Sequence, residues 1–171
     1  MMNPAKSSGL ERKHQRASCD CPAEFTWGTI NHSATVVIVG MGGGFVCAGV
    51  MVPKGEELEL SFCMEPSPEP IRCRAKVAWI AARGIRVRGQ TCRGFAVEFL
   101  RIYPEDRSRV DEYVKHQNRV FRAIGRELEK PAPDKELCKD LFSRVRPGDS
   151  LHMNHIRGVS MDELRYFRLR R

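Results

Sequence analysis

The sequence predicts a mainly β domain, a six-stranded antiparallel β-barrel, followed by a C-terminal helix and a helical extension. Three observations support this fold class. Apolar and polar residues alternate with a period of two in several runs between residues 22 and 100. Turn residues separate these runs at short intervals. From residue 105 the apolar spacing becomes that of an amphipathic helix.

The six expected strands follow one another without room for a crossover helix, which favours antiparallel pairing. In chain order they cover residues 23–27, 35–39, 45–50, 58–64, 71–79 and 95–99. Turns are predicted at Asn31–Ser33, Gly42–Gly44, Pro53–Gly55, Pro66–Pro70 and Arg83–Gly89. We interpret Arg83–Gly89 as a solvated loop between the last two strands, although its arginines could add phosphate contacts.

The helical part begins with Pro104-Glu105-Asp106, a composition typical of a first helical turn. An apolar stripe at i, i+3, i+4 spacing then predicts a helix over residues 105–129, which Pro131 ends. A second amphipathic segment ends at Val145. A third is expected to begin at the capping-box pattern Ser160–Glu163.

These patterns divide the chain into a flexible arm (1–10), a barrel with the start of a capping helix (11–116), and a helical extension (117–171). The apolar stripe of 105–129 is longer than a capping helix needs. Either the helical extension covers the remaining apolar residues of this helix, or those residues form a homodimer contact. The end of the chain alternates aromatic residues with arginines, which favours a helix docked on the barrel over a nucleic-acid or membrane contact.

Composition narrows the class of protein. The 171 residues carry a net charge of +8 and lack both an apolar run of membrane-spanning length and a signal-peptide core. Seven cysteines without a Cys-x-x-Cys pair indicate a reducing compartment, so we expect a cytoplasmic protein. No metal site is expected, because Cys19-Asp-Cys21 lacks a second pair and His152 and His155 lack a third ligand. No nucleophile motif is present, which argues against an enzyme.

Two motifs lie at defined positions relative to the expected strands. Arg12-Lys-His-Gln-Arg16 stands just before the first expected strand, and Gly40-Met-Gly-Gly43-Gly-Phe joins the second to the third. Val77-Ala-Trp79 and Gly94-Phe-Ala-Val-Glu-Phe99 follow downstream. Over residues 11–116 this order resembles the PilZ domain family. The resemblance implies a receptor for the bacterial second messenger cyclic di-GMP, without a cofactor, whose ligand-binding residues here would be Arg12, Arg16, Gly40 and Gly43.

The physical chemistry fits this ligand. A guanidinium pairs bidentately with phosphate oxygens or with the O6 and N7 atoms of guanine, and it stacks on a base. Two arginines on an arm can therefore close over a dianion and couple binding to a change of shape. Glycines let the backbone approach the ligand closely.

The second motif departs from the family pattern, Asp/Asn-x-Ser-x-x-Gly. With Gly43 as the motif glycine, Ile38 stands at the Asp/Asn position and Gly40 at the Ser position. Neither side chain offers a hydrogen bond. Each missing bond costs on the order of 1 kcal/mol, so affinity would fall roughly ten- to a thousandfold.

The sequence is therefore compatible with three functions. The first is a signalling protein that binds cyclic di-GMP and relays it to a protein partner. The second is a degenerate PilZ adaptor that binds proteins and no nucleotide, which Ile38 and Gly40 favour. The third, a basic barrel that binds nucleic acid, rests on charge alone, and we expect it least because basicity favours any polyanion.

Overall fold

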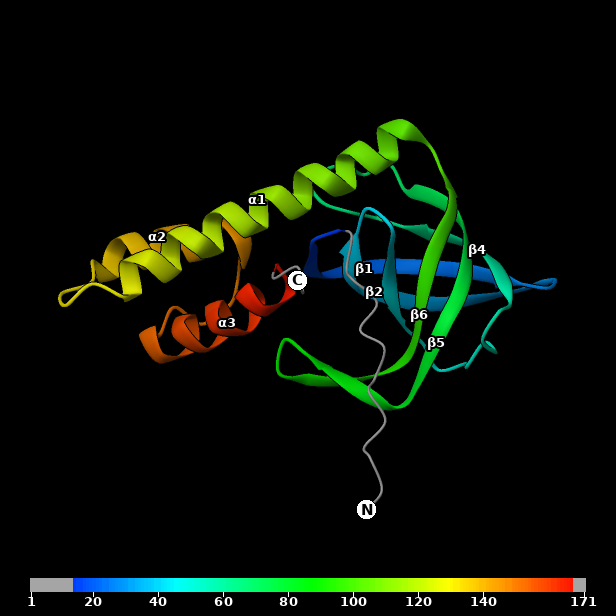
Figure 1. Cartoon of the computed structure of the whole chain (residues 1–171), viewed down its shortest axis with the longest axis horizontal. Helices are drawn as coiled ribbons and strands as arrows, with labels where there is room; N and C mark the ends of the chain where they lie inside the picture. Colours follow the sequence, from blue (N-terminus) through cyan, green and yellow to red (C-terminus); the bar gives the residue numbers. More distant parts are fainter. Residues whose placement is uncertain (1–13, 168–171) are drawn as a thin grey trace, which may run out of the picture.

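The computed structural model describes residues 14–167 and confirms the predicted fold class. Six antiparallel strands close into a barrel in the order β1-β2-β3-β6-β5-β4, and three helices follow (Figure 1). The strands are β1 (Arg16–Trp27), β2 (Ile30–Gly40), β3 (Gly43–Cys47), β4 (Glu57–Phe62), β5 (Ile71–Val87) and β6 (Gln90–Ile102). The helices are α1 (Pro104–Leu128), α2 (Lys135–Val145) and α3 (Met153–Tyr166).

The barrel interior is filled by the apolar faces of the alternating strands. Phe25, Leu60, Phe62, Ile71 and Phe95 are each less than 2% exposed. The edge of one ring meets the face of the next where Phe25 and Phe95 pack at a centroid distance of 5.5 Å. This burial is the main source of stability for the strands.

The helix α1 connects the barrel to the helical extension. It starts at the end of β6 and runs away from the barrel, and α2 and α3 pack along its outer half (Figure 1). Val120, Phe121 and Ile124 are buried there. The extension thus covers the excess apolar stripe within the chain, and a homodimer through this helix stays a prediction. The predicted boundary at residue 116 falls inside α1.

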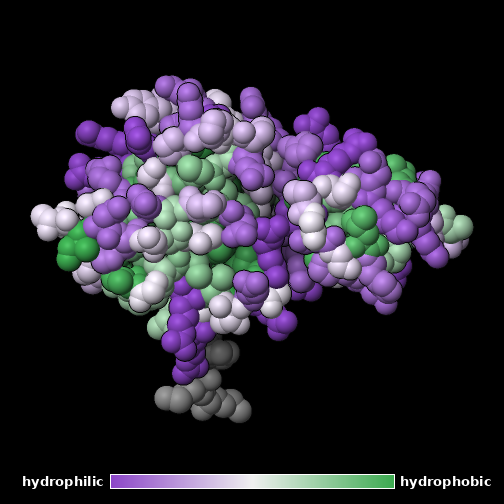
Figure 2. Space-filling view, turned by 180° about the vertical axis from the view of Figure 1, so that it is seen from behind, coloured by the Kyte–Doolittle hydropathy of each residue, from purple (hydrophilic) through white to green (hydrophobic). Residues whose placement is uncertain are grey.

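Seen from behind, the barrel and the helices form two lobes (Figure 2). Hydrophilic side chains cover much of the helical lobe in that view, whereas apolar side chains are visible among the strands. Within residues 14–167, no helix has the length and apolar character needed to span a bilayer.

Four local predictions were wrong. β1 begins at Arg16 rather than near residue 23, because a bulge between Ser18 and Cys21 interrupts the alternation. Asn31–Ser33 belong to β2, where they pair with residues 24–26 of β1, and the turn is at Gly28 (φ +64°). α3 begins at Met153, seven residues before the predicted capping box.

The fourth concerns Arg83–Gly89, which forms strand rather than loop as far as Val87. The β5–β6 ladder continues through the pairs Ile85–Cys92, Arg86–Thr91 and Val87–Gln90. Val87 and Cys92 are buried, and that burial stabilises a hairpin much longer than its turn residues predict.

Candidate functional site at the entry to the barrel

The structure brings the two predicted motifs together where the chain enters the barrel. Arg16 lies opposite Gly40 in the β1–β2 ladder, and Gly40 lies opposite Gly43 in the β2–β3 ladder. Three of the four predicted ligand-binding residues therefore occupy adjacent strand ends. Arg12 lies outside the described residues.

The glycines are required by the packing of the strands themselves. A Cβ on Gly43 would lie 2.0 Å from the carbonyl oxygen of Val97 on β6. A Cβ on Gly40 would lie 2.7 Å from the Gln15 carbonyl oxygen and 3.0 Å from Cγ of Arg16. Larger side chains would push the strands apart, so this glycine motif has a structural explanation independent of any ligand.

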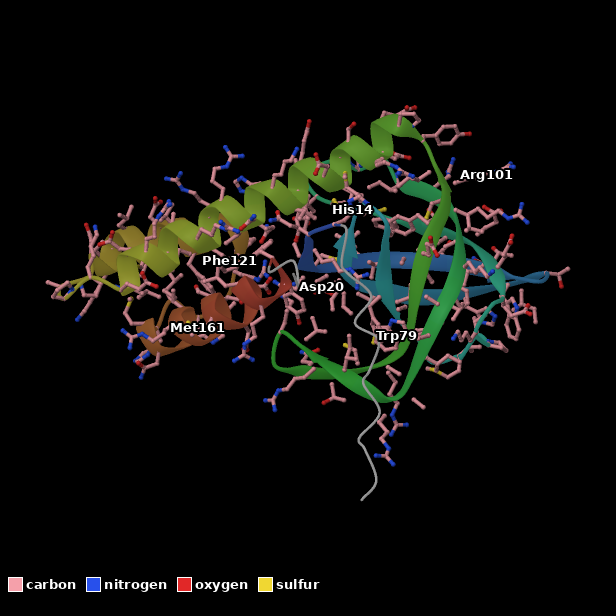
Figure 3. All side chains as sticks on the ribbon, in the orientation of Figure 1. His14, Asp20, Trp79, Arg101, Phe121 and Met161 are labelled. Carbon is pink, nitrogen blue, oxygen red and sulfur yellow. The ribbon has the colours of Figure 1, made fainter. Side chains whose placement is uncertain are left out.

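The residues between the two motif arginines contact both the turn and α1. The His14 ring, labelled in Figure 3, approaches Gly42, where an added Cβ would lie 3.2 Å from its Cδ2. The side-chain amide of Asn118 on α1 donates to Oε1 of Gln15 at 2.9 Å. The chain therefore reaches β1 between the β2–β3 turn and the capping helix.

Ile38, which occupies the expected Asp/Asn position, is 8% exposed. It belongs to a second apolar cluster, distinct from the barrel core, which we call the outer cluster. The partly buried ring of Tyr166 from α3 packs against this cluster. Its buried members are Val37, Ile38, Phe45, Val87, Cys92 and Ala96. The position that should offer a polar group is covered by apolar side chains.

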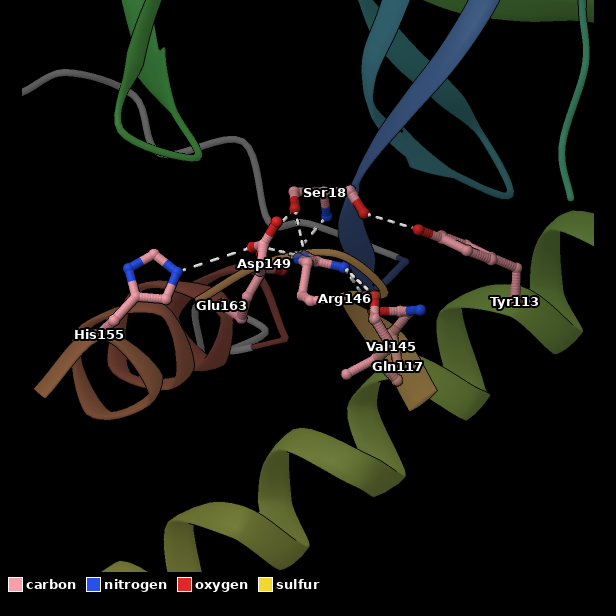
Figure 4. Close-up of polar contacts among 8 residues, drawn as sticks. All are labelled: Ser18, Tyr113, Gln117, Val145, Arg146, Asp149, His155 and Glu163. Atoms are coloured by element: carbon pink, nitrogen blue, oxygen red, sulfur yellow. Dashed lines mark hydrogen bonds and ion pairs between the residues drawn. The ribbon is translucent and has the colours of Figure 1, made fainter. Parts of the chain in front are cut away.

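A buried ionic network includes Ser18, two residues after Arg16, and its contacts are drawn in Figure 4. The guanidinium of Arg146 donates from Nη2 to Oε1 of Glu163 and to Oγ of Ser18, both at 2.7 Å. Its Nη1 donates to Gln117 Oε1 at 3.1 Å. The Arg146 and Glu163 side chains are 1% and 3% exposed. Such a pair is stable only because each charge is neutralised and hydrogen-bonded.

This network joins β1 to all three helical segments. Ser18 donates its hydroxyl to Glu163 on α3, and its carbonyl oxygen accepts from the Tyr113 hydroxyl on α1 at 2.9 Å. Arg146 follows α2 and stacks over the Phe121 ring at 5.1 Å. Burial raises the pKa of Tyr113, which keeps this hydroxyl a donor. Ser18, two residues after the start of β1 at Arg16, is thus held by the helical extension.

Cys19 within the β1 bulge and Cys21 at its end are buried, and all seven cysteines of the chain are unbridged. Burial raises the pKa of the Cys19 thiol well above its ordinary value, and this thiol donates to the Val36 carbonyl oxygen at 3.2 Å. Among residues 14–167, no three His, Cys, Asp or Glu side chains gather as metal ligands would. The thiol of Cys19 thus adds a contact between β1 and β2.

Sequence reasoning missed Arg146 and Glu163, because charged residues in a basic tail are usually solvated. One signal was available. Ile156, Ser160, Glu163 and Phe167 follow a helical i, i+4, i+7, i+11 spacing. All four are buried. An acidic residue on an apolar stripe predicts a buried cationic partner.

Comparison with known proteins gives one family. The family model for the PilZ domain matches residues 10–116, more than half of the chain. No curated protein matches it at a significant level.

Solved structures show the same fold at low sequence identity. The Bacillus subtilis inhibitor of motility MotI/DgrA is 18% identical at a TM-score of 0.52, over 62% of this chain and 50% of that one. The PilZ domain of Escherichia coli YcgR with c-di-GMP is 13% identical at a TM-score of 0.51, and the match covers 68% of this chain and 98% of that one. The Escherichia coli YcgR structure in complex with c-di-GMP is 14% identical at a TM-score of 0.53, and the match covers 69% of this chain and 50% of that one. The chain thus matches about half the length of MotI and of YcgR.

The motif order, the closed six-stranded barrel and the family match over residues 10–116 agree: this chain belongs to the PilZ domain family.

Proposed function

We propose that this PilZ domain is a cytoplasmic signalling protein that binds cyclic di-GMP and relays it, without catalysis, to a protein partner. Arg12 and Arg16 would bind the ligand through their guanidiniums, and the backbone at Gly40 and Gly43 would line the binding site. The observation that carries the proposal is the pairing of Arg16 with Gly40, which sets the two motifs side by side at one end of the barrel.

The relay is supported by the buried network. The motif arm leads directly into β1, and Ser18 is bound by Glu163 of α3. Binding of a dianion by Arg12 and Arg16 would bias the position of the first residues of β1. A change there alters the contacts that hold α3, so ligand binding would change the surface that the extension offers to a partner.

The test is calorimetric titration of the full chain with cyclic di-GMP, with GTP as the control nucleotide. We expect saturable binding in the micromolar range or tighter, lost in the Arg12→Ala/Arg16→Ala variant. The Arg119→Ala/Arg126→Ala variant removes the same charge from the exposed face of α1 and should bind normally. Absence of heat at high protein concentration would refute the receptor function.

A degenerate adaptor is the second candidate, and the burial of Ile38 favours it. In that case the barrel and its extension would bind protein partners and no nucleotide. The same titration discriminates, because an adaptor gives no heat with cyclic di-GMP while the fold remains intact by circular dichroism.

A further inference from the structure

A groove lies between the tip of the β5–β6 hairpin and α3, outside the two family motifs. Its volume is about 470 Å³, within the range of small-molecule sites. The hairpin contributes Arg86, Arg88 and Gly89. α3 contributes Asn154, Arg165 and Tyr166 among others. Cations, an amide, an aromatic ring and the carboxylates of Asp162 and Glu163 thus face one concave surface.

The charges around this groove leave two cations available. Arg165 pairs with Asp162 at 3.3 Å, and Glu163 is neutralised by Arg146 at 2.7 Å. Within residues 14–167, no ion pair joins Arg86 or Arg88 to a carboxylate, and both side chains are exposed. Two available guanidiniums complement a ligand that carries two phosphate charges.

Arg88 also has an unusual backbone. Its φ is +50°, the one positive φ of a non-glycine residue within residues 14–167, and Gly89 follows at +78°. A two-residue hairpin turn of this kind favours Asn or Gly at the first position, and a longer side chain there is strained. The turn geometry therefore leaves the choice of arginine unexplained, whereas a groove that needs a guanidinium explains it.

The groove adjoins the degenerate motif. Val87, between the two groove arginines, packs in the outer cluster with Ile38, and Tyr166 contacts the same cluster. Glu163 at the groove binds Ser18, two residues from Arg16. The hairpin and α3 thus bring polar groups to the neighbourhood in which Ile38 and Gly40 provide none.

We propose that this groove is the second half of the cyclic di-GMP site. Arg86 and Arg88 bind a phosphate and the guanine edge, and Tyr166 provides a ring against which the base packs. These groups replace the hydrogen bonds lost at Ile38 and Gly40. The proposal rests on the receptor function above and adds three residues from elements outside its motifs.

The experiment compares four forms of the full chain by calorimetric titration with cyclic di-GMP. They are the unmodified protein, Arg12→Ala/Arg16→Ala, Arg86→Ala/Arg88→Ala, and the control Arg83→Ala/Arg93→Ala. The control removes two exposed arginines of the same hairpin that do not line the groove. We expect the groove variant to bind at least about tenfold more weakly and the control to change affinity by less than about threefold.

A fifth variant, Arg88→Gly, separates binding from folding. Glycine suits the positive φ, so the hairpin keeps its turn while the guanidinium is lost. We expect weaker binding with an unfolding midpoint no lower than that of the unmodified protein.

The outcomes separate the two proposals. Binding that needs Arg12 and Arg16 but is unchanged in the groove variant overturns the groove and leaves the receptor function standing. Binding that needs Arg86 and Arg88 but survives loss of Arg12 and Arg16 supports a ligand site in the groove. It overturns the proposed role of Arg12 and Arg16 in binding. No binding by the unmodified protein overturns both.

Discussion

The barrel interior and the junction between β1 and the helices are equally buried but are held by different interactions. Apolar contacts fill the barrel, where Phe25 packs against Phe95 and Phe62 against Phe99. Ser18 is the one buried polar side chain within the described strands, and it contacts the Arg146–Glu163 pair. Apolar packing tolerates small changes of shape, whereas a buried ion pair depends on both of its partners. The barrel therefore gives the fold its stability, and the junction determines how the helices sit on it.

The largest expected effect comes from breaking the junction with Glu163→Ala. This variant leaves the Arg146 guanidinium buried without its carboxylate, at a cost of about 3–5 kcal/mol. Hydrogen exchange should show faster opening of α2 and α3 while the barrel strands stay protected. Equal loss of protection in the barrel would mean that the two regions are one cooperative unit.

Its control is Glu136→Ala on α2. That carboxylate pairs with Lys139 at 2.7 Å, but its side chain is 83% exposed. An exposed pair of this kind contributes little, so stability should change by no more than about 0.5 kcal/mol.

Replacing both buried charges sharpens the comparison. In Arg146→Met/Glu163→Leu no charge is left buried, and the remaining loss comes from Ser18 and Gln117, which lose partners. We expect about 1–3 kcal/mol of destabilisation, less than that of Glu163→Ala alone. Urea unfolding of both variants measures the difference. A double variant as unstable as the single one would show that the junction depends on more than charge pairing.

Alkaline pH should weaken the barrel through its buried thiols. Burial raises the pKa of Cys73 from 9.0 to about 12. Below pH 9 the Cys73 thiol is protonated in both the folded and the unfolded chain, so it gives the free energy of unfolding no pH dependence there. Above pH 9 it ionises more readily in the unfolded chain, so stability falls between pH 9 and 12 by up to about 1.4 kcal/mol per pH unit.

Urea midpoints measured between pH 8 and 10.5 test this contribution. Cys73→Ala should flatten the pH dependence relative to the unmodified protein. Cys63→Ala, which removes an exposed cysteine, should leave it unchanged. An identical slope in all three proteins would exclude Cys73 as a contributor.

The smallest expected effects separate core from hairpin tip. Ile71→Val deletes one methylene from a residue that is 0% exposed and should cost about 0.5–1.5 kcal/mol. Arg88→Gly relieves a positive φ and should stabilise by up to about 1 kcal/mol. Thermal unfolding measures both. A destabilised Arg88→Gly variant would indicate that the Arg88 side chain makes a stabilising contact in the unliganded protein.

Strands whose faces differ clearly were predictable from sequence. Leu58, Leu60 and Phe62 alternate with polar residues, and the structure buries all three. The β5–β6 extension was missed, although Ile85 and Val87 also alternate with arginines, because Gly84 and Gly89 indicate a loop. β1 was shortened in the prediction because a bulge shifts its period at Ser18.

The candidate site was predictable in part. The positions of Arg16, Gly40 and Gly43 relative to the strands could be inferred, and the ladders place these residues on adjacent strand ends. The surroundings of Ile38 could not, since they depend on a hairpin and a helix that are distant in sequence. The helical spacing around Glu163 indicated a buried carboxylate, but its partner Arg146 lies 17 residues away and could not be identified from the spacing.

The contact between Ser18 and Glu163 also has a consequence for synthesis of the chain. The two residues are 145 positions apart, so all six strands leave the ribosome before α3 is available. During that interval the first strand has its neighbours β2 and β4 but lacks the carboxylate that will bind Ser18. Ser18 therefore lacks this partner until residue 163 has left the ribosome, and arrest before that point would expose the surface normally covered by the helices.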